Sequence, residues 1–125
     1  MIAVWSYDDP ALADPALDAA FQRYARGDVA AYWPPERQAV GEGYRRIPFP
    51  FAEVPAPVFP MERACTLAEL AGYVGTWSAA TRFARTTGRD AAAELTEALA
   101  PSWGDPGRHV VVRWPLVVRA GRTPA

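Results

Sequence analysis

The middle of the chain is crowded with proline, and this feature limits the fold more than any other. Seven of the 13 prolines fall between Pro34 and Pro60. Proline lacks a backbone N–H and has a fixed φ angle, so it interrupts both helices and sheet ladders. We therefore expect residues 47–60 to be extended, with four apolar side chains packed on the body of the protein: Phe49, Phe51, Val54 and Phe59.

Strand patterns lie at both ends of the chain and after the proline-rich stretch. Residues 2–7 are a short apolar run before a turn signal, which predicts a strand buried on both faces in a parallel sheet. Residues 61–65 predict a short edge strand. Residues 109–119 alternate and predict one strand with Pro115 at a bulge, followed by a loose tail from Ala120.

Helix signals fill the rest. Asp14 followed by Pro15 predicts a helix start. Thr66 and Glu69 have the spacing of a capping box, and the apolar spacing after them predicts one helix to about residue 84 or 87. Two further helices are expected over 36–46 and from residue 91 to 99, the second one stopped by Pro101.

Composition limits the class of protein. A chain of 125 residues, half of them apolar, fits one folded domain. No apolar run reaches the roughly 18 residues of a membrane span and no signal segment opens the chain, so we expect no membrane contact and a cytoplasmic location. The net charge of −1 argues against nucleic-acid binding. The single Cys65 and single His109 predict no disulfide and no metal site.

Local motifs for catalysis are weak, so the sequence assigns no catalytic residue. Gly41-Glu42-Gly43 does not lie between a strand and a helix, which favours a plain turn over a phosphate cradle. No serine has the surroundings of a hydrolase nucleophile. Asp8 and Asp9 could form an acid–base pair, but their position before Pro10 favours a turn.

Aromatic residues are the more suggestive feature. Tyr7 lies at the carboxyl end of the first strand, and ligands bind outside such ends in open α/β sheets. A pocket role and a packing role are therefore equally open for Tyr7 and Trp33. Helical spacing favours a core position for Trp77. Every basic residue is arginine, which fits codon bias and also suits carboxylate binding.

Six short words of the sequence, taken in their order and spacing, resemble the C-terminal half of class I S-adenosylmethionine-dependent methyltransferases of the type 11 branch, which includes trans-aconitate methyltransferases. They span about residues 2–119 and read Val4-Trp5-Ser6-Tyr7, Tyr32-Trp33-Pro34-Pro35-Glu36-Arg37, Pro48-Phe49-Pro50-Phe51, Thr66-Leu67-Ala68-Glu69-Leu70, Tyr73 to Ala79 and Val112-Arg113-Trp114-Pro115-Leu116.

The resemblance implies an α/β fold. Residues 1–125 would form a single C-terminal subdomain, with a partial Rossmann-like sheet of strands five, six and seven and a helical insertion over the acceptor site. Residues 2–7 would match the fifth strand, residues 59–65 the sixth, and residues 109–119 an antiparallel seventh strand between them. The N-terminal half, with the Gly-rich loop and the acidic residue that bind S-adenosylmethionine, is absent. The resemblance therefore implies that this chain has no cofactor-binding residues and is inactive alone.

The resemblance also implies an acceptor site for a small molecule such as a carboxylic acid. A carboxylate acceptor needs a cation to hold it, and an arginine fork suits that role. Arg82 is the first choice, with Arg45, Arg46 and Arg113 weaker. The candidate substrate-binding residues are Tyr7, Tyr32, Trp33, Trp77, Ser78 and Arg82.

Two hypotheses of different classes follow. The first is a methyltransferase portion, left by a truncated or split gene, whose partners are a methyl acceptor and its missing N-terminal half, or a second copy through self-association. The second is a small non-enzymatic domain that pairs with a partner chain through its first strand. Coding DNA upstream of Met1 would discriminate between them, because a frame for a Gly-rich strand–loop–helix would favour the first.

Overall fold

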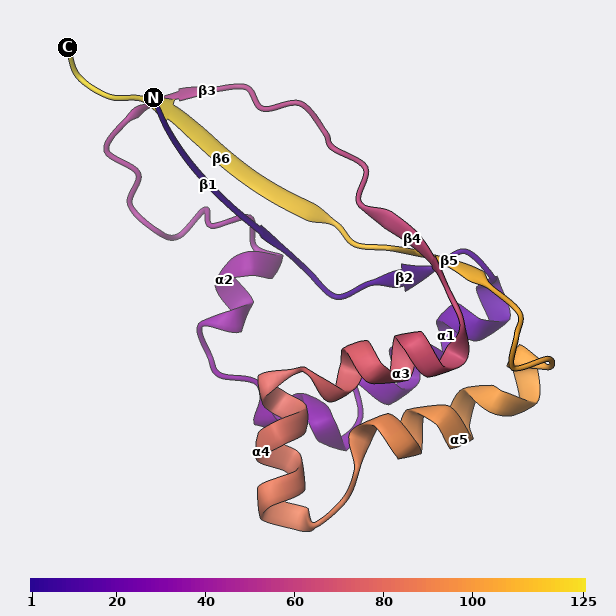
Figure 1. Ribbon diagram of the computed structural model, residues 1–125. Helices are drawn as coiled ribbons and strands as arrows, with labels where there is room; N and C mark the ends of the chain where they lie inside the picture. Colours follow the sequence, from indigo (N-terminus) through magenta and orange to yellow (C-terminus); the bar gives the residue numbers. More distant parts are fainter. The chain divides into compact units, whose positions relative to one another are not determined.

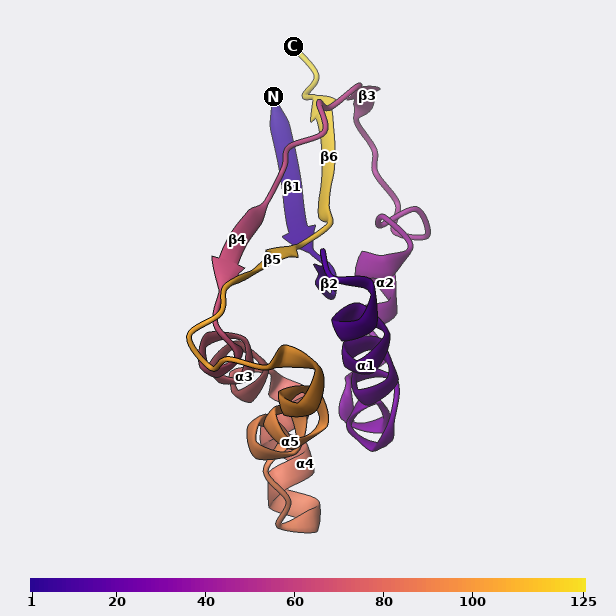
Figure 2. The same ribbon diagram turned by 90° about the vertical axis from the view of Figure 1, so that its right-hand side faces the viewer.

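Two compact units make up the structure, a computed structural model that describes residues 1–125. The strand unit comprises Met1–Pro10, Pro35–Met61 and Trp114–Ala125. The helical unit comprises Ala11–Pro34 and Glu62–Arg113. Each unit combines segments that are far apart in the sequence, and each contains one three-stranded antiparallel sheet (Figures 1 and 2). The prediction of a single domain whose cofactor-binding half lies elsewhere stays a prediction.

The sheet of the strand unit has the order β1-β6-β3. It consists of β1 (Ile2–Tyr7), β6 (Leu116–Arg122) and β3 (Ala52–Val54), and β6 runs antiparallel to both neighbours. The resemblance placed residues 109–119 between the strands at residues 2–7 and 59–65. Instead, β6 lies between β1 and β3, and the strand at residues 62–65 belongs to the other sheet. The prediction that residues 2–7 form a strand buried on both faces of a parallel sheet is wrong. β1 lies at the edge, pairs only with β6, and leaves most of its side chains exposed.

The proline-rich connection is extended, as predicted, apart from short elements. The helix expected over residues 36–46 is limited to α2 (Arg37–Gly41), and the chain turns after it with positive φ at Gly43 and Tyr44. Phe49 and Phe51 contact each other edge to face, with ring centroids 5.2 Å apart. Phe59 is exposed, so the expectation that it packs on the protein is wrong.

The sheet of the helical unit has the order β2-β5-β4. It consists of β2 (Ala11–Leu12), β5 (Val110–Arg113) and β4 (Glu62–Cys65). The edge strand predicted over residues 61–65 is confirmed, since β4 pairs only with β5. Burial raises the pKa of the Cys65 thiol at its end, as expected for a structural cysteine.

The single strand predicted over residues 109–119 is divided into β5 and β6 at Trp114-Pro115. Pro115 has no N–H to donate, but its carbonyl accepts a hydrogen bond from the N–H of Asp8 at 3.0 Å. The N–H of Trp114 bonds to the carbonyl of Met61 at 2.8 Å. The tail expected to be loose from Ala120 is instead part of β6, which continues to Arg122.

Helix starts follow the predicted caps. The Asp14 carboxylate accepts hydrogen bonds at the start of α1 (Pro15–Ala25), and the bond from the Leu17 N–H lowers the pKa of this carboxyl. A 3-10 helix, η1 (Asp28–Tyr32), follows α1. The Thr66–Glu69 capping box opens α3 (Leu67–Gly75).

The helix expected to run from residue 67 to 84 or 87 is two helices. α3 ends at Gly75, and α4 (Ser78–Thr87) begins after Trp77, whose backbone is extended. Trp77 is only 5% exposed. Burial of its large ring at the turn outweighs the propensity of the sequence to continue as one helix.

The expected stop at Pro101 is also wrong. Helix α5 (Ala91–Trp103) continues past Pro101 for two residues. Its last residue, Trp103, is buried, and the indole Nε1 donates a 3.0 Å hydrogen bond to the Arg108 carbonyl. Helices α1 and α3 both pack on α5. The core of this unit comprises Leu17, Phe21, Leu70, Val74, Phe83, Leu95, Leu99 and Trp103.

Gly121 of β6 provides a test of the strand unit. A Cβ atom there would lie 2.7 Å from Cε1 of Phe49 and 2.8 Å from Cβ of Phe51. We predict that Gly121→Ala lowers the free energy of unfolding in urea by about 1–3 kcal/mol, because β3 or Phe49 must move. Gly72→Ala is the control, since that helical position has open space and alanine favours helix. Equal urea midpoints for wild type and Gly121→Ala would contradict the packing.

Candidate functional site

The residues predicted to bind substrate do not all fall in one unit. Tyr7 ends β1 in the strand unit. The other five lie in the helical unit, at the end of η1 and around the start of α4: Tyr32, Trp33, Trp77, Ser78 and Arg82.

Trp77 is the centre of an aromatic cluster that we define as Phe21, Trp33, Tyr73 and Trp77. Its ring centroid lies 5.3 Å from that of Trp33, 5.9 Å from that of Tyr73 and 6.3 Å from that of Phe21. Trp77 is buried, as its helical spacing predicted, so its role is packing. Trp33 and Tyr73 are only half-buried, so they form the accessible part of the cluster. Tyr32 packs edge to face on Phe83, with centroids 5.4 Å apart.

Ser78 and Arg82 extend from this cluster along α4. They are four residues apart, which places them on one face of the helix, and both are exposed. Arg82 forms no ion pair, so its guanidinium can bind a carboxylate. Two of the weaker arginine candidates are already engaged, Arg46 with Glu42 and Arg113 with Glu62.

Tyr7 lies beside an arginine that the sequence analysis did not single out. Nη1 of Arg37 donates to the Tyr7 carbonyl at 3.1 Å, and Nη2 lies 3.1 Å from Oδ1 of Asp9 and 3.5 Å from Oδ1 of Asp8. Oδ1 of Asp8 also accepts a hydrogen bond from the N–H of Asp9 at 2.8 Å. Residues 8–10 form no turn, so the predicted turn is wrong. Arg37 belongs to the Pro-Pro-Glu-Arg motif, and this motif was the only feature of the sequence that pointed to it.

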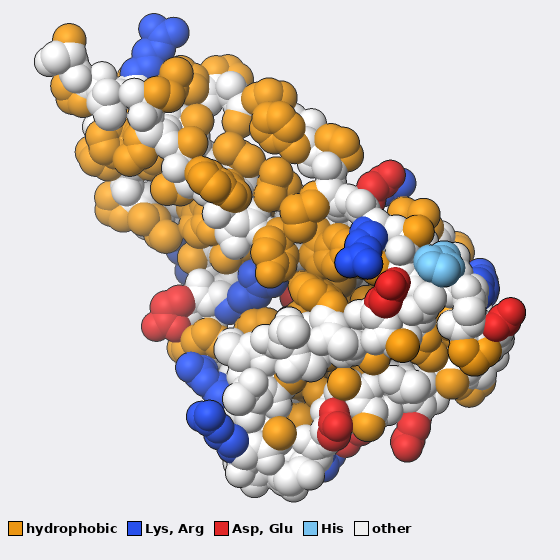
Figure 3. Space-filling model, viewed as in Figure 1, with side chains coloured by type: hydrophobic (Ala, Val, Ile, Leu, Met, Phe, Trp, Pro, Cys, Tyr) orange, Lys and Arg blue, Asp and Glu red, His pale blue; other side chains and the backbone are white.

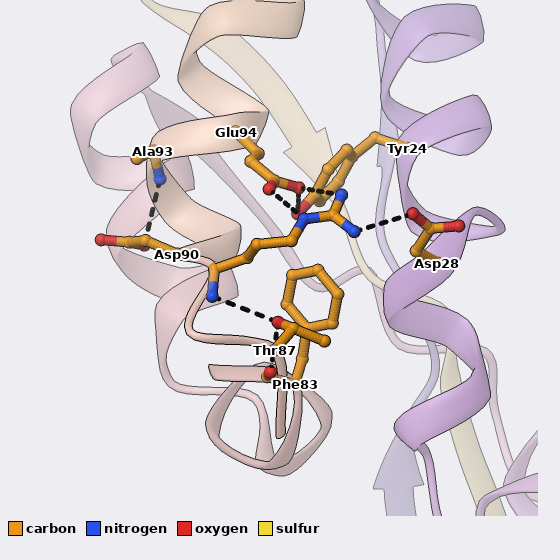
Figure 4. A network of polar contacts seen from close by, with 8 residues as sticks. Tyr24, Asp28, Phe83, Thr87, Asp90, Ala93 and Glu94 are labelled. Carbon is orange, nitrogen blue, oxygen red and sulfur yellow. Dashed lines mark hydrogen bonds and ion pairs between the residues drawn. The ribbon is translucent and has the colours of Figure 1, made fainter. Parts of the chain in front are cut away.

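A second arginine, Arg89, binds Asp28 and Glu94 in a polar network of the helical unit, and both partners are labelled in Figure 4. Its Nε and Nη2 donate to both oxygens of Glu94, at 2.7 and 2.9 Å, and its Nη1 donates to Asp28 at 2.9 Å. These bonds, first that to Glu94, raise the pKa of Arg89. The guanidinium also lies over the Phe83 ring, 4.7 Å from its centroid. No sequence motif indicated this network.

Tyr24 completes the network, because its hydroxyl donates to Oε1 of Glu94 at 3.4 Å. Burial, reinforced by the Glu94 charge, raises the pKa of Tyr24 to about 12. A cavity of about 320 Å³ lies beside these side chains, between α1, η1 and α5. Since the carboxylates of Asp28 and Glu94 both bind the Arg89 guanidinium, we assign the network a structural role.

No strand of the structure leads through a glycine into a following helix. Residues 8–14 between β1 and α1, and Thr66 between β4 and α3, include no glycine. Gly41 and Gly43 follow a five-residue helix rather than a strand. The structure contains no group of three or more side chains suited to a metal ion. None of its helices has the length and apolarity needed to cross a bilayer.

Comparison with known proteins gives one informative result. No protein-family model and no curated protein matches the chain. A solved structure described as "a Putative Type II Methyltransferase from Anaeromyxobacter dehalogenans" is 44% identical and superposes with a TM-score of 0.86. The match covers 96% of this chain and 51% of that one, so this chain spans about half the length of the Anaeromyxobacter protein. The similarity supports a methyltransferase-like protein with a mixed α/β fold.

The Tyr24 hydroxyl makes the free energy of unfolding depend on pH in the alkaline range. Its pKa is about 12 in the folded chain against an ordinary value of 10. As the pH rises from 10 towards 12, the unfolded chain loses this proton first, so the free energy of unfolding falls. We predict that Tyr24→Phe flattens this fall in urea denaturation, whereas Tyr7→Phe, which removes a hydroxyl outside the network, preserves it. Identical pH profiles for both variants would contradict the assignment.

Proposed function

We propose that this chain is the C-terminal, acceptor-binding portion of an S-adenosylmethionine-dependent methyltransferase. The observation that carries the proposal is the match at 44% identity over nearly the whole chain to about half of a protein described as a methyltransferase. The chain's own residues support the acceptor-binding role, because they provide an accessible aromatic surface and an unpaired arginine but no cofactor cradle.

The acceptor we propose is a small carboxylic acid, in the manner of the trans-aconitate methyltransferase branch. Arg82 would bind the carboxylate through its planar fork, and Ser78, one turn earlier, would donate a hydrogen bond. The half-buried rings of Tyr32 and Trp33 would pack against the apolar part of the acceptor. Tyr7 lies at the end of β1 in the strand unit, and its role in acceptor binding stays a prediction.

The cofactor-binding portion would be a polypeptide segment outside residues 1–125. This assignment fits the 51% coverage of the Anaeromyxobacter protein and the lack of glycine between any strand and the following helix. The chain alone would then be inactive, since positioning of donor and acceptor supplies most of the catalysis in such a transfer.

A second candidate function rests on the exposed edge of β1. β1 pairs only with β6, and its Trp5 is 69% exposed. A non-enzymatic domain could use this edge to pair with a strand of a partner protein. The two functions differ in their dependence on Arg82, because strand pairing does not involve α4.

We predict that the purified chain binds S-adenosylmethionine very weakly or not at all. The physical reason is that no glycine-containing turn lets a cofactor approach the backbone between a strand and a helix. Isothermal titration calorimetry measures this affinity directly. A micromolar dissociation constant would show that the cofactor-binding residues lie within residues 1–125, against the proposal.

The acceptor site can be tested in one polypeptide. A chimera joins the unmatched half of the Anaeromyxobacter protein to this chain, and methyl ester formation from small dicarboxylic and tricarboxylic acids is measured. We predict that Arg82→Ala raises KM for the acceptor by about tenfold or more, because one charge-assisted fork is lost, while cofactor affinity is unchanged.

Arg85→Ala is the matched control, since Arg85 is also exposed on α4 and forms no ion pair. It should leave the acceptor KM unchanged. An equal KM for wild type and Arg82→Ala would remove Arg82 from the site. A correctly folded chimera that methylates none of the acids would contradict the proposed acceptor class.

A further inference from the structure

We propose that Arg89 is a positioning residue for the acceptor site. Through Asp28 and Phe83, its guanidinium holds the segment 28–33 along helix α4. This segment carries two of the rings that the proposed acceptor site uses, those of Tyr32 and Trp33. The inference rests on the proposed function and specifies how that site keeps its aromatic side in place.

The segment 28–33, which comprises η1 and Trp33, follows α4 from its C-terminal end to its N-terminal end. Three contacts connect the segment to α4 and its flanking residues: Asp28 to Arg89 with Oδ2 and Nη1 2.9 Å apart, Tyr32 to Phe83 with ring centroids 5.4 Å apart, and Trp33 to Trp77 with ring centroids 5.3 Å apart. Residue numbers rise along the segment while those of its partners fall, so the segment and the helix run antiparallel.

The segment has few other means of keeping its place. η1 is a 3-10 helix of five residues, and its N-cap, Gly27, provides no side-chain hydrogen bond. Val29 is the only buried residue of η1, and Pro34 follows the segment without an N–H to donate. Short 3-10 helices have poor hydrogen-bond geometry and little stability of their own. The position of Tyr32 and Trp33 therefore depends on the contacts with α4 and with Arg89.

The backbone before Arg89 fixes where its side chain starts. Gly88 ends α4 with a φ of 73°, in the left-handed region that turns a chain out of a helix. The Thr87 hydroxyl donates to the Phe83 carbonyl at 2.6 Å and accepts from the Arg89 N–H at 3.1 Å. Arg89 is thereby tied to the last turn of α4.

The Arg89 guanidinium binds three partners at once. Its Nε and Nη2 donate to the two oxygens of Glu94, which leaves Nη1 for Asp28. The same group lies 4.7 Å from the centre of the Phe83 ring, on which Tyr32 packs. Glu94 and Asp28 approach from opposite sides in Figure 4, with the Phe83 ring near them. Glu94 thus orients the fork, and the fork connects the first residue of η1 to the ring that its last residue contacts.

Each ring of the segment contacts a residue that neighbours a polar candidate of the acceptor site. The ring partner of Tyr32 directly follows Arg82 in the sequence. The ring partner of Trp33 directly precedes Ser78. Basic side chains lie at the edge of the molecule beside α4 in the space-filling view (Figure 3). A shift of the segment along α4 would change the distances from both rings to Ser78 and Arg82, so Arg89 acts on the acceptor through the segment.

The Arg89–Asp28 ion pair is exposed, which allows a selective test. The two side chains are 45% and 73% exposed. Exposed ion pairs add little to the free energy of unfolding, and salt screens them. Loss of the Asp28 carboxylate leaves Arg89 paired with Glu94, so no buried charge loses its partner. Asp28→Ala should therefore release the segment without unfolding the chain.

Proton NMR of the full chain tests the link from the ion pair to the rings. Asp28→Ala should weaken the nuclear Overhauser cross-peaks between the Tyr32 and Phe83 rings by about twofold or more, because one end of the segment is released. Glu97→Ala is the matched control, since Glu97 is an exposed carboxylate of the same unit and forms no ion pair. It should leave these cross-peaks unchanged. Equal cross-peaks in wild type and Asp28→Ala would overturn the proposal.

The consequence for the acceptor is measured in the covalent chimera. Asp28→Ala should raise KM for the acceptor by about threefold to tenfold and also lower kcat, because displaced rings bind and orient the acceptor less well. Glu97→Ala should change neither constant. An unchanged KM together with a lower urea midpoint for Asp28→Ala would assign the ion pair a purely structural role and overturn the proposal.

Salt separates the ion pair from other effects of the substitution. Between about 0.05 M and about 1 M sodium chloride, screening should bring the KM ratio of Asp28→Ala to wild type towards one, because the wild-type pair is weakened. The ratio cancels the direct effect of salt on a carboxylate bound to Arg82. A ratio above one that does not change with salt would show that the substitution acts by another route, against the proposal.

Arg89→Lys decides the question if Asp28→Ala does not fold. Lysine keeps the charge but loses the fork that binds Glu94 and Asp28 together. This variant should raise the acceptor KM and weaken the ring cross-peaks in the same way. Wild-type values for both would overturn the proposal.

The two kinds of measurement distinguish this proposal from the proposed function. Weaker ring cross-peaks with a chimera that methylates no acid would support the link from Arg89 to the rings and contradict the proposed acceptor class. A chimera that methylates small carboxylic acids with a KM indifferent to Asp28→Ala would support the function and contradict the positioning role.

Discussion

The backbone pairing of β6 with β1 and β3 is the interaction on which the strand unit depends. β6 is the only strand of this sheet with a neighbour on each side, and it joins the two ends of the chain to the proline-rich middle. Its sequence includes no proline, so every residue can contribute a backbone N–H. Gly121 allows Phe49 and Phe51 to approach closely, and Arg119 fixes the segment over the sheet. One strand thus organises segments that have no regular structure of their own.

Where no ladder of backbone hydrogen bonds is present, arginine side chains join segments that are distant in the sequence. Arg37, Arg89 and Arg119 each bind two or more groups that are distant in sequence, such as Asp28 and Glu94 in the case of Arg89. Lysine, a single point charge, would not make these planar, multiple contacts. The all-arginine composition therefore has a structural use here, whatever its origin in codon usage. Arg82, like Arg85 on the same helix, is exposed and forms no ion pair, so its fork is available for a ligand.

The sequence analysis predicted the helix caps correctly. It failed where burial of a large side chain overrides the local helix propensity. The caps at Asp14 and Thr66 act at short range and were both found. The break at Trp77 and the continuation through Pro101 depend on burying Trp77 and Trp103, which local propensity does not contain. The exposure of β1 was missed because an apolar run indicates burial without saying what covers it. For the candidate site, spacing identified Trp77 as core, but the contacts of Arg37 and Arg89 join distant segments that no spacing relates.

The two units differ in how completely they bury apolar side chains and pair polar groups, and this difference bears on function. The helical unit buries its apolar side chains around α5 and pairs Arg89 with Asp28 and Glu94. Its exposed residues Ser78 and Arg82 are polar, so their hydration costs the fold little free energy. The strand unit leaves unpaired backbone groups and an aromatic side chain, Trp5, in water. An unpaired edge of this kind promotes aggregation of a protein that acts alone. In a protein that is completed by another polypeptide, the same edge can pair with that polypeptide. The proposed acceptor site thus belongs to the helical unit, and the unpaired strand edge belongs to the strand unit.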